Sequence, residues 1–228
     1  MRTYPFYLVS TPIGNLEDIS HRAIEILGSI DVLFAEDTRK TRTLLQRYGI
    51  KVSVFAFHDH NKERVTPGVI ERLKGGETAA LVSDAGMPGI SDPGYYLVRR
   101  LIDEGIAFTV IPGASAVTTA LVLSGLPTDK FAFLGYLPRK KGALARVLGE
   151  AADYTGTSIF FESPHRIVKT LRIASEVMGD REVVVAREMT KLHEEIIRGT
   201  GAEVADRMEK GRVRGEITLL VRGKGRKG

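Results

Sequence analysis

The sequence has 228 residues, no cysteine, and 33 Lys and Arg residues against 28 Asp and Glu, which gives a formal net charge of +5. This length predicts one large domain or two small ones, and the absence of cysteine excludes disulfides, thiolate zinc sites and a cysteine nucleophile. No stretch of about 18 apolar residues occurs, so we expect no membrane span and a cytoplasmic protein, whose mild basicity permits a nucleic-acid partner.

Short apolar runs alternate with segments of helical periodicity in the first half of the chain. Thr38 is expected to cap the helix that follows it, and Gly49 to end that helix in a left-handed conformation. Asp92 is a suitable N-cap, and Pro93 suits the first helical position after it. The strict alternation predicts a mostly parallel sheet covered by helices. The expected strands are residues 6–10, 31–35, 52–57, 79–82 and 107–111, and the expected helices are residues 22–27, 39–48, 69–73 and 95–103.

The second half begins at Pro112-Gly113, where we place a domain boundary. It divides the chain into an N-terminal α/β domain of residues 1–112, a C-terminal α/β domain of residues 113–222 and a basic, disordered tail of residues 223–228. Alternation is less regular in the second domain, which allows antiparallel hairpins. The expected strands are residues 131–134, 157–161, 182–186, 193–198 and 215–221, and the expected helices are residues 114–123, 143–152, 167–178 and 202–210.

The loop Ser83–Gly94 lies between a buried strand and a helix and is the segment most typical of a ligand site. It contains one carboxylate near the strand end, Asp84, and its glycines, including Gly86, let a ligand approach the backbone closely. In open α/β sheets, ligands bind at the carboxyl ends of strands. With Met87 as an apolar contact, the loop suits a zwitterionic, partly apolar cofactor.

A second strand ends at Glu36-Asp37, directly before a helix. Helix capping explains Asp37 and Thr38. It does not explain the three cations that follow in the first turns, where the helix dipole disfavours positive charge. These cations, Arg39, Lys40 and Arg42, indicate an anionic substrate.

Three further clusters have both structural and functional interpretations. His58 and His60 form a weak metal-binding pattern, and we favour a structural or substrate-contacting role over a metal. The segments Phe161–Arg166 and Arg187–Lys191 combine acids with cations at strand ends, where a salt-bridge network is as good an explanation as function. The basic segment Arg139–Lys141 can contact phosphates.

Several fingerprints of α/β enzymes are missing. The sequence contains neither G-x-G-x-x-G nor G-x-x-x-x-G-K-[ST], and it lacks H-E-x-x-H and G-x-S-x-G. Dehydrogenases, P-loop phosphotransferases and serine hydrolases are therefore disfavoured, and a ligand without a pyrophosphate fits better.

Seven motifs occur in an order that resembles one known family. The sequence is similar, from Tyr7 to Val221, to the bacterial 16S ribosomal RNA cytidine 2′-O-methyltransferases, which belong to the tetrapyrrole methylase-like superfamily. The motifs are Ser10–Asn15, Glu36–Arg39, Phe57–Asn61, Ser83–Gly94, Pro112–Ala116, Phe161–Arg166 and Ala186–Glu188.

The resemblance implies two α/β domains of the tetrapyrrole methylase type, with S-adenosylmethionine in a cleft between them, and a homodimer. It also explains the missing fingerprints, because these methyltransferases do not use a Rossmann glycine loop. Many members carry an additional C-terminal helical domain, on which we expect methyl transfer not to depend. The residues expected at the cofactor are Ile13, Asp84, Gly86, Met87, Ser115, Ala116, Phe161, Ile217 and Thr218.

The implied substrate is 16S rRNA in the small ribosomal subunit, without a metal. Candidates for the acceptor of the ribose proton are Asp37, Glu36, Glu162 and His58, among which an acid is favoured over the histidine. Two alternatives are a tetrapyrrole C-methyltransferase and a non-catalytic RNA-binding module. The residues expected to contact RNA are Arg39, Lys40, Arg42, Arg139, Lys140, His165, Arg166 and Arg187.

Overall fold

The computed structural model describes residues 3–225, and the chain divides after Ser115 into two compact units, residues 1–115 and 116–228. The boundary expected at Pro112-Gly113 lies between the last strand of the first unit and the first helix of the second. Among the described residues, no helix is long and apolar enough to span a membrane.

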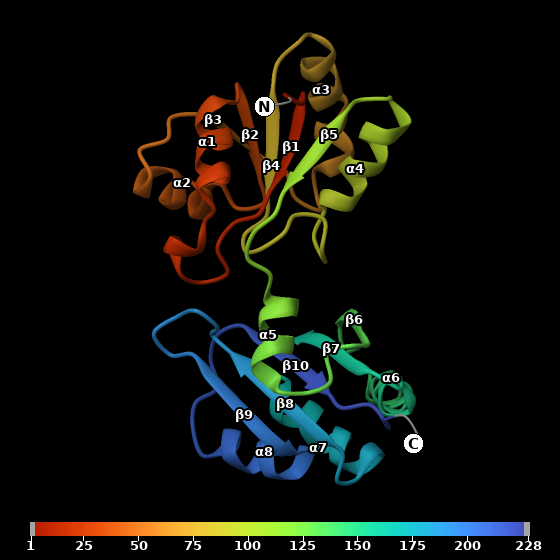
Figure 1. The fold of residues 1–228 in the computed structure, drawn as a ribbon. Coiled ribbons are helices and arrows are strands. Elements are labelled where there is room, and N and C mark those ends of the chain that lie inside the picture. The colour runs from red at the N-terminus through yellow and green to blue at the C-terminus, as the bar shows by residue number, and fades with distance from the viewer. Residues whose placement is uncertain (1–2, 226–228) are drawn as a thin grey trace. The chain divides into compact units, whose positions relative to one another are not determined.

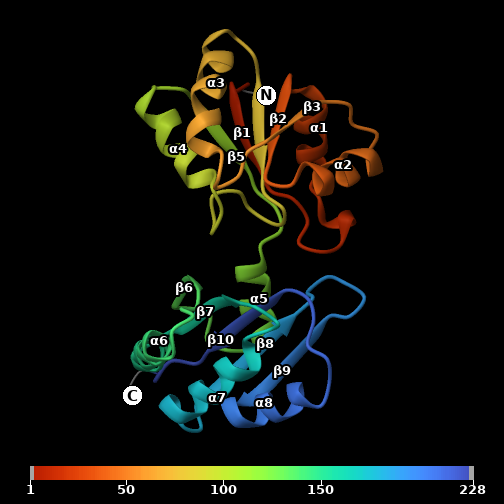
Figure 2. The same ribbon diagram turned by 180° about the vertical axis from the view of Figure 1, so that it is seen from behind.

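The first unit is a five-stranded sheet between two pairs of helices (Figures 1 and 2). Its strands follow the order β3-β2-β4-β1-β5, and every pair is parallel, which confirms the expected sheet. The elements are β1 (Phe6–Val9), α1 (His21–Ser29), β2 (Val32–Ala35), α2 (Thr38–Arg47), β3 (Ser53–Ala56), α3 (Lys62–Lys74), β4 (Ala79–Val82), α4 (Gly94–Asp103) and β5 (Phe108–Ile111), with a short 3-10 turn at Leu16–Asp18.

Alternate residues of the central strands pack on opposite faces of this sheet. On β1, Phe6 and Leu8 join a core with α3 and α4, whereas Tyr7 and Val9 join a core with α1 and α2. Such alternation is what a strand covered on both faces requires, because successive side chains point to opposite sides.

Helix α3 is longer than expected from the sequence. It begins at Lys62 instead of near Val69, and Pro67 lies inside it. Proline removes one backbone donor, but Val69 and Leu73 of the same helix are buried in the core, and this burial outweighs the lost hydrogen bond.

The second unit is a mixed sheet with strand order β6-β7-β10-β8-β9. Only β6 and β7 are parallel among its described pairs, and β8 with β9 forms the kind of hairpin that the irregular alternation allowed. The elements are α5 (Ala116–Ser124), β6 (Phe131–Tyr136), α6 (Lys141–Asp153), β7 (Thr157–Glu162), α7 (Ile167–Met178), β8 (Glu182–Arg187), β9 (Glu195–Thr200), α8 (Gly201–Glu209) and β10 (Ile217–Val221).

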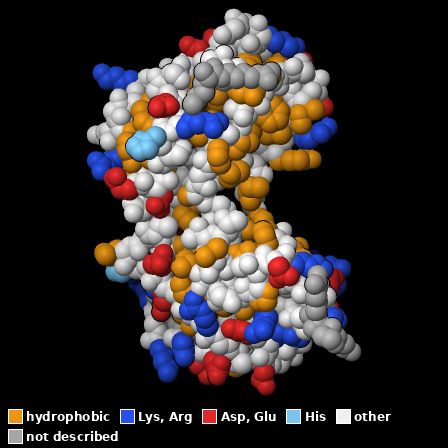
Figure 3. All heavy atoms as spheres, in the orientation of Figure 1, with side chains coloured by type: hydrophobic (Ala, Val, Ile, Leu, Met, Phe, Trp, Pro, Cys, Tyr) orange, Lys and Arg blue, Asp and Glu red, His pale blue; other side chains and the backbone are white. Residues whose placement is uncertain are grey.

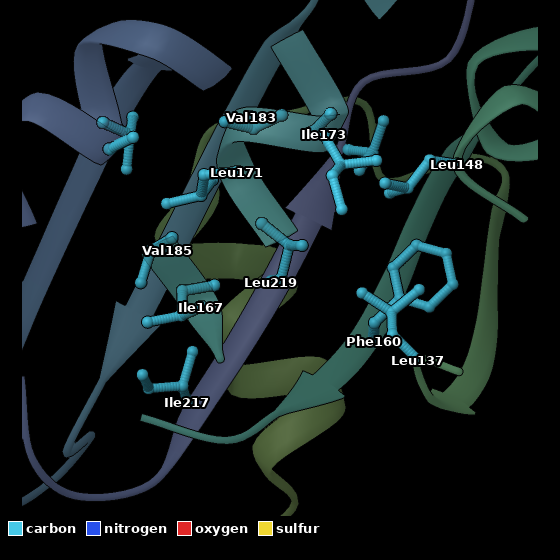
Figure 4. Packing of buried hydrophobic residues seen from close by; sticks show 14 of the residues in the cluster. Leu137, Leu148, Phe160, Ile167, Leu171, Ile173, Val183, Val185, Ile217 and Leu219 are labelled. Atoms are coloured by element: carbon cyan, nitrogen blue, oxygen red, sulfur yellow. The ribbon is translucent and has the colours of Figure 1, made fainter. Parts of the chain in front are cut away.

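One face of this second sheet carries the main core of the unit. Figure 4 shows Ile217 and Leu219 of β10 beside Val183 and Val185 of β8, with side chains of α7 packed against them. The opposite face of the sheet packs on α5. Strand positions in this unit therefore also alternate between two environments.

The expectation of a disordered tail is wrong for residues 223 and 224. Gly223 is buried, the Lys224 N–H donates to the Tyr154 carbonyl at 2.9 Å, and the Lys224 ammonium bonds to Asp153 at 2.8 Å. Residues 226–228, which include Arg226 and Lys227, lie outside the described part of the chain.

Candidate active site

The motifs of the first unit gather at one edge of its sheet. Because all five strands are parallel, the loops that follow them leave from the same edge. In the order of the sheet, these loops carry His58, then Glu36 and Asp37, then Asp84, then the loop from Ser10, and finally residues 112–115. Segments about a hundred residues apart in sequence are thus neighbours.

Hydrogen bonds join these loops to one another. The Asp37 N–H donates to Asp84 Oδ1 at 2.9 Å, and Thr11 and Gly86 exchange two backbone bonds of 2.9 and 3.0 Å. Gly86 has φ +83°, and a Cβ added to it would lie 3.4 Å from Ile13 Cγ2. A larger residue would therefore be strained here, and the glycine keeps the loop close to Ile13.

Glu36 stands out electrostatically among the carboxylates of this edge. Its partial burial raises its pKa, and repulsion from the carboxylates of Asp84, Asp92 and Asp59 adds to the effect. Backbone hydrogen bonding from Asp84 opposes the shift without cancelling it. A carboxylate with a raised pKa binds a proton more readily than an ordinary one, which suits a proton acceptor.

The pKa of Asp37 is shifted in the opposite direction, below its usual value. Asp37 is the N-cap of α2, so the expectation that Thr38 would cap this helix is wrong: the Arg39 N–H donates to Asp37 Oδ1 at 2.9 Å, and Thr38 is the first helical residue. Hydrogen bonds from the Arg39 guanidinium, with N···O distances of 2.8 and 3.1 Å, hold the pKa of Asp37 well below its usual range. Such a carboxylate is a weak base.

The cations of this turn mostly pair with carboxylates of the same chain. The Lys40 ammonium lies 2.7 Å from Asp84 Oδ2, and Arg39 is held by Asp37. These pairs account for two of the three cations that the sequence associated with an anionic substrate. Arg42 is exposed, and no ion pair to it is found within residues 3–225.

Two polar atoms at this edge have no hydrogen-bond partner among the described residues. They are Ser10 Oγ, at the end of β1, and His58 Nδ1, after β3. Buried polar atoms of a folded protein are almost always paired, so these two are available to a ligand or to water. No group of three or more His, Asp or Glu side chains within residues 3–225 is arranged to hold a metal ion.

The cofactor candidates of the second unit lie on two faces of its sheet. Phe161 and Thr218 are paired across β7 and β10, and alternation places them on the face away from helices α6 to α8. The Phe161 ring lies 4.8 Å from that of Phe133 and 5.6 Å from that of Tyr136, measured between centroids. Ile217 points into the helical core, so its side chain faces away from a ligand on the Phe161 face. Of the other two candidates, Ser115 closes the first unit and Ala116 begins α5.

Glu162 is fully engaged in internal bonds. Its side chain is buried, and its two oxygens accept from the Ser163 N–H at 2.7 Å, the Thr170 hydroxyl at 2.8 Å and Arg166 at 3.1 Å. Arg166 also donates to the carbonyls of Leu137 and Pro138, both at 2.9 Å. This network ties β7, α7 and the end of β6 together, which is a structural role.

The expected RNA-binding residues of the second unit gather at one end of its sheet, because β6, β7 and β8 end where β10 begins. Arg139, Lys140 and His165 are exposed there, whereas Arg187 is bonded to Glu195 at 2.8 Å. Two exposed arginines of the α8–β10 loop, missed by the sequence reasoning, lie at the same end: Arg212 and Arg214. The basic stretch Lys210–Arg214 was the available signal.

The charged surface of α7 and α8 is different. Figure 3 shows Lys and Arg interspersed with Asp and Glu over this part of the second unit. Arg172, for example, is bonded to Asp206 at 2.6 Å and to Glu209 at 2.7 Å. Cations paired in this way offer little to a phosphate.

Known proteins that resemble this chain have consistent names. The model of the tetrapyrrole (corrin/porphyrin) methylases matches residues 5–205. The ribosomal RNA small subunit methyltransferase I of Halalkalibacterium halodurans is 49% identical over 97% of this chain and 76% of its own length. Proteins of the same name from Thermotoga maritima and Bacillus subtilis are 48% and 46% identical over 95% of this chain, and the match covers 97% and 74% of them.

Solved structures with the same fold are more distant in sequence. The methyltransferase CobJ has a TM-score of 0.72 at 17% identity, with 99% of this chain and 98% of that chain covered. A cobalt precorrin-4 methyltransferase of cobalamin biosynthesis has a TM-score of 0.67 at 18% identity, with 95% and 94% covered. These structures share the fold. The match of the family model over residues 5–205 and the 46–49% identity to the three relatives place the chain in the tetrapyrrole (corrin/porphyrin) methylase family and, within it, among the ribosomal RNA small subunit methyltransferase I proteins.

Proposed function

We propose that this protein transfers a methyl group from S-adenosylmethionine to the 2′-oxygen of a cytidine ribose in 16S rRNA of the small ribosomal subunit, in the cytoplasm and as a homodimer. The observation that carries the proposal is the identity of 46–49% to small subunit rRNA methyltransferases along nearly the whole chain. S-adenosylmethionine supplies a sulfonium methyl group that is already electrophilic. The protein therefore has to bind the donor and the RNA, orient the ribose hydroxyl toward the methyl group, and accept the hydroxyl proton.

The first unit has features that fit the methionine part of this donor. The glycine loop after β4 lies against Ile13, and Asp84 supplies a carboxylate beside it. The unpartnered Ser10 hydroxyl lies at the end of the neighbouring strand β1. We assign the cofactor contacts of this unit to Ile13, Asp84, Gly86 and Met87, and those elsewhere in the chain to Ser115, Ala116, Phe161, the backbone of Ile217, and Thr218.

Replacing Ser10 with Ala is expected to weaken cofactor binding without destabilising the fold. The hydroxyl has no partner among the described residues, so its loss breaks no internal bond. A hydrogen bond to the cofactor contributes about 1 kcal/mol, or roughly a fivefold change in Kd. Calorimetry with S-adenosylhomocysteine and thermal unfolding measure the two quantities; an unchanged Kd would remove Ser10 from the site.

Glu36 is the best proton acceptor among the four candidates. Its pKa is raised by burial and by neighbouring carboxylates, whereas that of Asp37 is lowered by Arg39. Glu162 is buried in a bonded network. His58 keeps a free ring nitrogen and remains the second candidate.

The reaction forms the bond between the ribose 2′-oxygen and the methyl carbon as the bond from that carbon to sulfur breaks. The hydroxyl proton passes to the carboxylate of Glu36. Alignment of the hydroxyl with the methyl group contributes several kcal/mol to catalysis, on the order of 7 or more in well-oriented systems. Proton acceptance adds roughly 10²–10⁴-fold in rate.

The function is tested by incubating the protein with small ribosomal subunits and S-adenosylmethionine labelled in the methyl group. The expected result is one labelled nucleotide in 16S rRNA, a cytidine whose extra mass lies on the ribose. A tetrapyrrole C-methyltransferase would leave the subunits unlabelled and label a tetrapyrrole. A binding module without catalysis would label neither and would not bind S-adenosylhomocysteine.

A further inference from the structure

The loop between β8 and β9, residues 188–194, has an unusual backbone. Glu188 and Thr190 adopt φ values of +50° and +65°, a left-handed conformation that costs energy in residues other than glycine. Figure 1 shows this loop extending beyond the ends of β8 and β9. Strain of this kind persists only where the surroundings hold it in place.

The base of the loop is held by a compact set of bonds. The carboxylate of Glu188 accepts from the Glu216 N–H at 2.8 Å and from the Lys191 ammonium at 2.9 Å. These bonds outweigh the burial that would otherwise raise the pKa of Glu188, so that pKa is lowered and the ion pair is maintained. A Cβ added to Gly215 would lie 2.3 Å from Glu188 Cδ, so only glycine leaves room for this arrangement.

The upper part of the loop is held as well. The Thr190 N–H donates to Glu194 Oε2 at 2.7 Å, and the Glu194 N–H donates to the Lys191 carbonyl at 3.1 Å. The side chain of Met189, in the same loop, is buried. The loop is therefore a braced structure rather than a chain segment free to fold its apolar side chains inward.

The tip of this braced loop presents a leucine to solvent. Leu192 is 93% exposed, more than any other large hydrophobic side chain that the structure describes, and His193 beside it is also exposed. A single exposed leucine on a mobile loop needs no explanation. A leucine held outward by a strained and bonded backbone does need one, because the protein gains nothing from it alone.

The surroundings of the tip favour an anionic partner. Three carboxylates near it pair with cations of the same chain, Glu195 with Arg187 and both Glu188 and Glu216 with Lys191. A fourth, Glu194, accepts the Thr190 N–H. For Arg212 and Arg214, no ion pair is found within the described part of the chain, and both are exposed at this end of the sheet. An apolar tip and two arginines without an ion pair among the described residues therefore lie at the same end of this sheet.

We propose that the β8–β9 loop is a rigid wedge that inserts Leu192 between bases of the RNA substrate, with Arg212 and Arg214 on the neighbouring phosphates. The inference rests on the proposed function, since it needs RNA as substrate. Apolar side chains beside cations unstack base steps in this way, and nucleotides splayed out of a stack are those that proteins read and modify. The wedge exposes the ribose hydroxyl by pulling its nucleotide out of the stack.

The test compares Leu192→Ser with Val177→Ser, a matched change of an exposed aliphatic residue on α7. Leu192→Ser is expected to lower kcat/KM on small ribosomal subunits by at least about tenfold. Leu192→Phe, which keeps a large apolar side chain at the tip, should retain a kcat/KM close to that of the wild type. Affinity for S-adenosylhomocysteine, thermal stability and sedimentation should stay unchanged. In subunits reconstituted with 2-aminopurine beside the target cytidine, wild-type protein should raise the fluorescence and Leu192→Ser should not.

Two outcomes would overturn the wedge while leaving the methyltransferase intact. One is wild-type kcat/KM in Leu192→Ser. The other is a loss of activity that accompanies a change from dimer to monomer, which would make the loop a contact between copies of the chain. Failure of the wild-type protein to methylate subunits would instead overturn the proposed function and the wedge together.

Discussion

Replacing Glu36 with Gln is expected to lower the single-turnover rate of methyl transfer by roughly 10²–10⁴-fold, with cofactor affinity nearly unchanged. Glutamine has the same shape but cannot take the proton of the ribose hydroxyl. The rate is measured with labelled S-adenosylmethionine on small ribosomal subunits. Asp37→Asn is the matched control: Asn also caps helices, and the Asp37 carboxylate is a weak base, so this variant should stay within a few-fold of wild type.

The pH dependence gives an independent measure of the same carboxylate. Glu36 must be ionised to accept a proton, so the wild-type rate should rise with pH through its raised pKa and then level off. The free energy of unfolding should instead fall as pH rises. Because folding raises the pKa of Glu36, the wild-type protein loses stability as pH rises from the unfolded to the folded pKa, a loss that Glu36→Gln does not share. If Glu36→Gln kept the full rate of methyl transfer, or if its rate still rose with pH as in the wild type, Glu36 would be excluded as the proton acceptor.

Replacing Glu162 with Ala is expected to destabilise the second unit by about 3 kcal/mol, because three donors lose the buried carboxylate to which they are bonded. Thr170 loses its acceptor, and Arg166 keeps only the carbonyls of Leu137 and Pro138. Urea unfolding followed by circular dichroism measures the loss, and hydrogen exchange of peptides from β7 and α7 locates it.

Two further variants separate structure from catalysis at this position. Glu162→Gln keeps one acceptor oxygen and should lose less stability than Glu162→Ala. Glu150→Ala, on the exposed surface of α6, should lose almost none. If Glu162→Ala were as stable as wild type but slow in methyl transfer, the carboxylate would be a catalytic group and the structural assignment would be wrong.

The first sheet could be predicted well because the patterns that indicate its strands and helices lie within short stretches of sequence. Apolar runs alternate with helical segments along the chain, and parallel strands deliver the loops that follow them to one edge. The placement of Asp37 and Asp84 at the same edge of the sheet could therefore be anticipated from strand ends, whereas their contact depends on β2 lying next to β4. The β8–β9 hairpin was anticipated only as a possibility, because no motif fixed the direction of these strands.

The choice among the acids could not be made from the sequence. Glu36 and Asp37 are adjacent, but their pKa values shift in opposite directions. Arg39 bonds Asp37, whereas Glu36 is partly buried near three carboxylates from two other loops. The structural role of Glu162 depends on Arg166 reaching the carbonyls of Leu137 and Pro138, in the segment that follows β6. Such effects follow from tertiary proximity, to which local sequence patterns give no access.

The position of β1 has a consequence for how the first unit is made. This strand is synthesised before the rest of the first unit, yet its two partner strands begin only at residues 79 and 108. Until β4 and β5 have been synthesised, the nascent chain holds an apolar strand with both edges open to other polypeptides. We expect chaperones to engage this segment during translation, and the unit to fold late and as a whole once residue 111 has emerged.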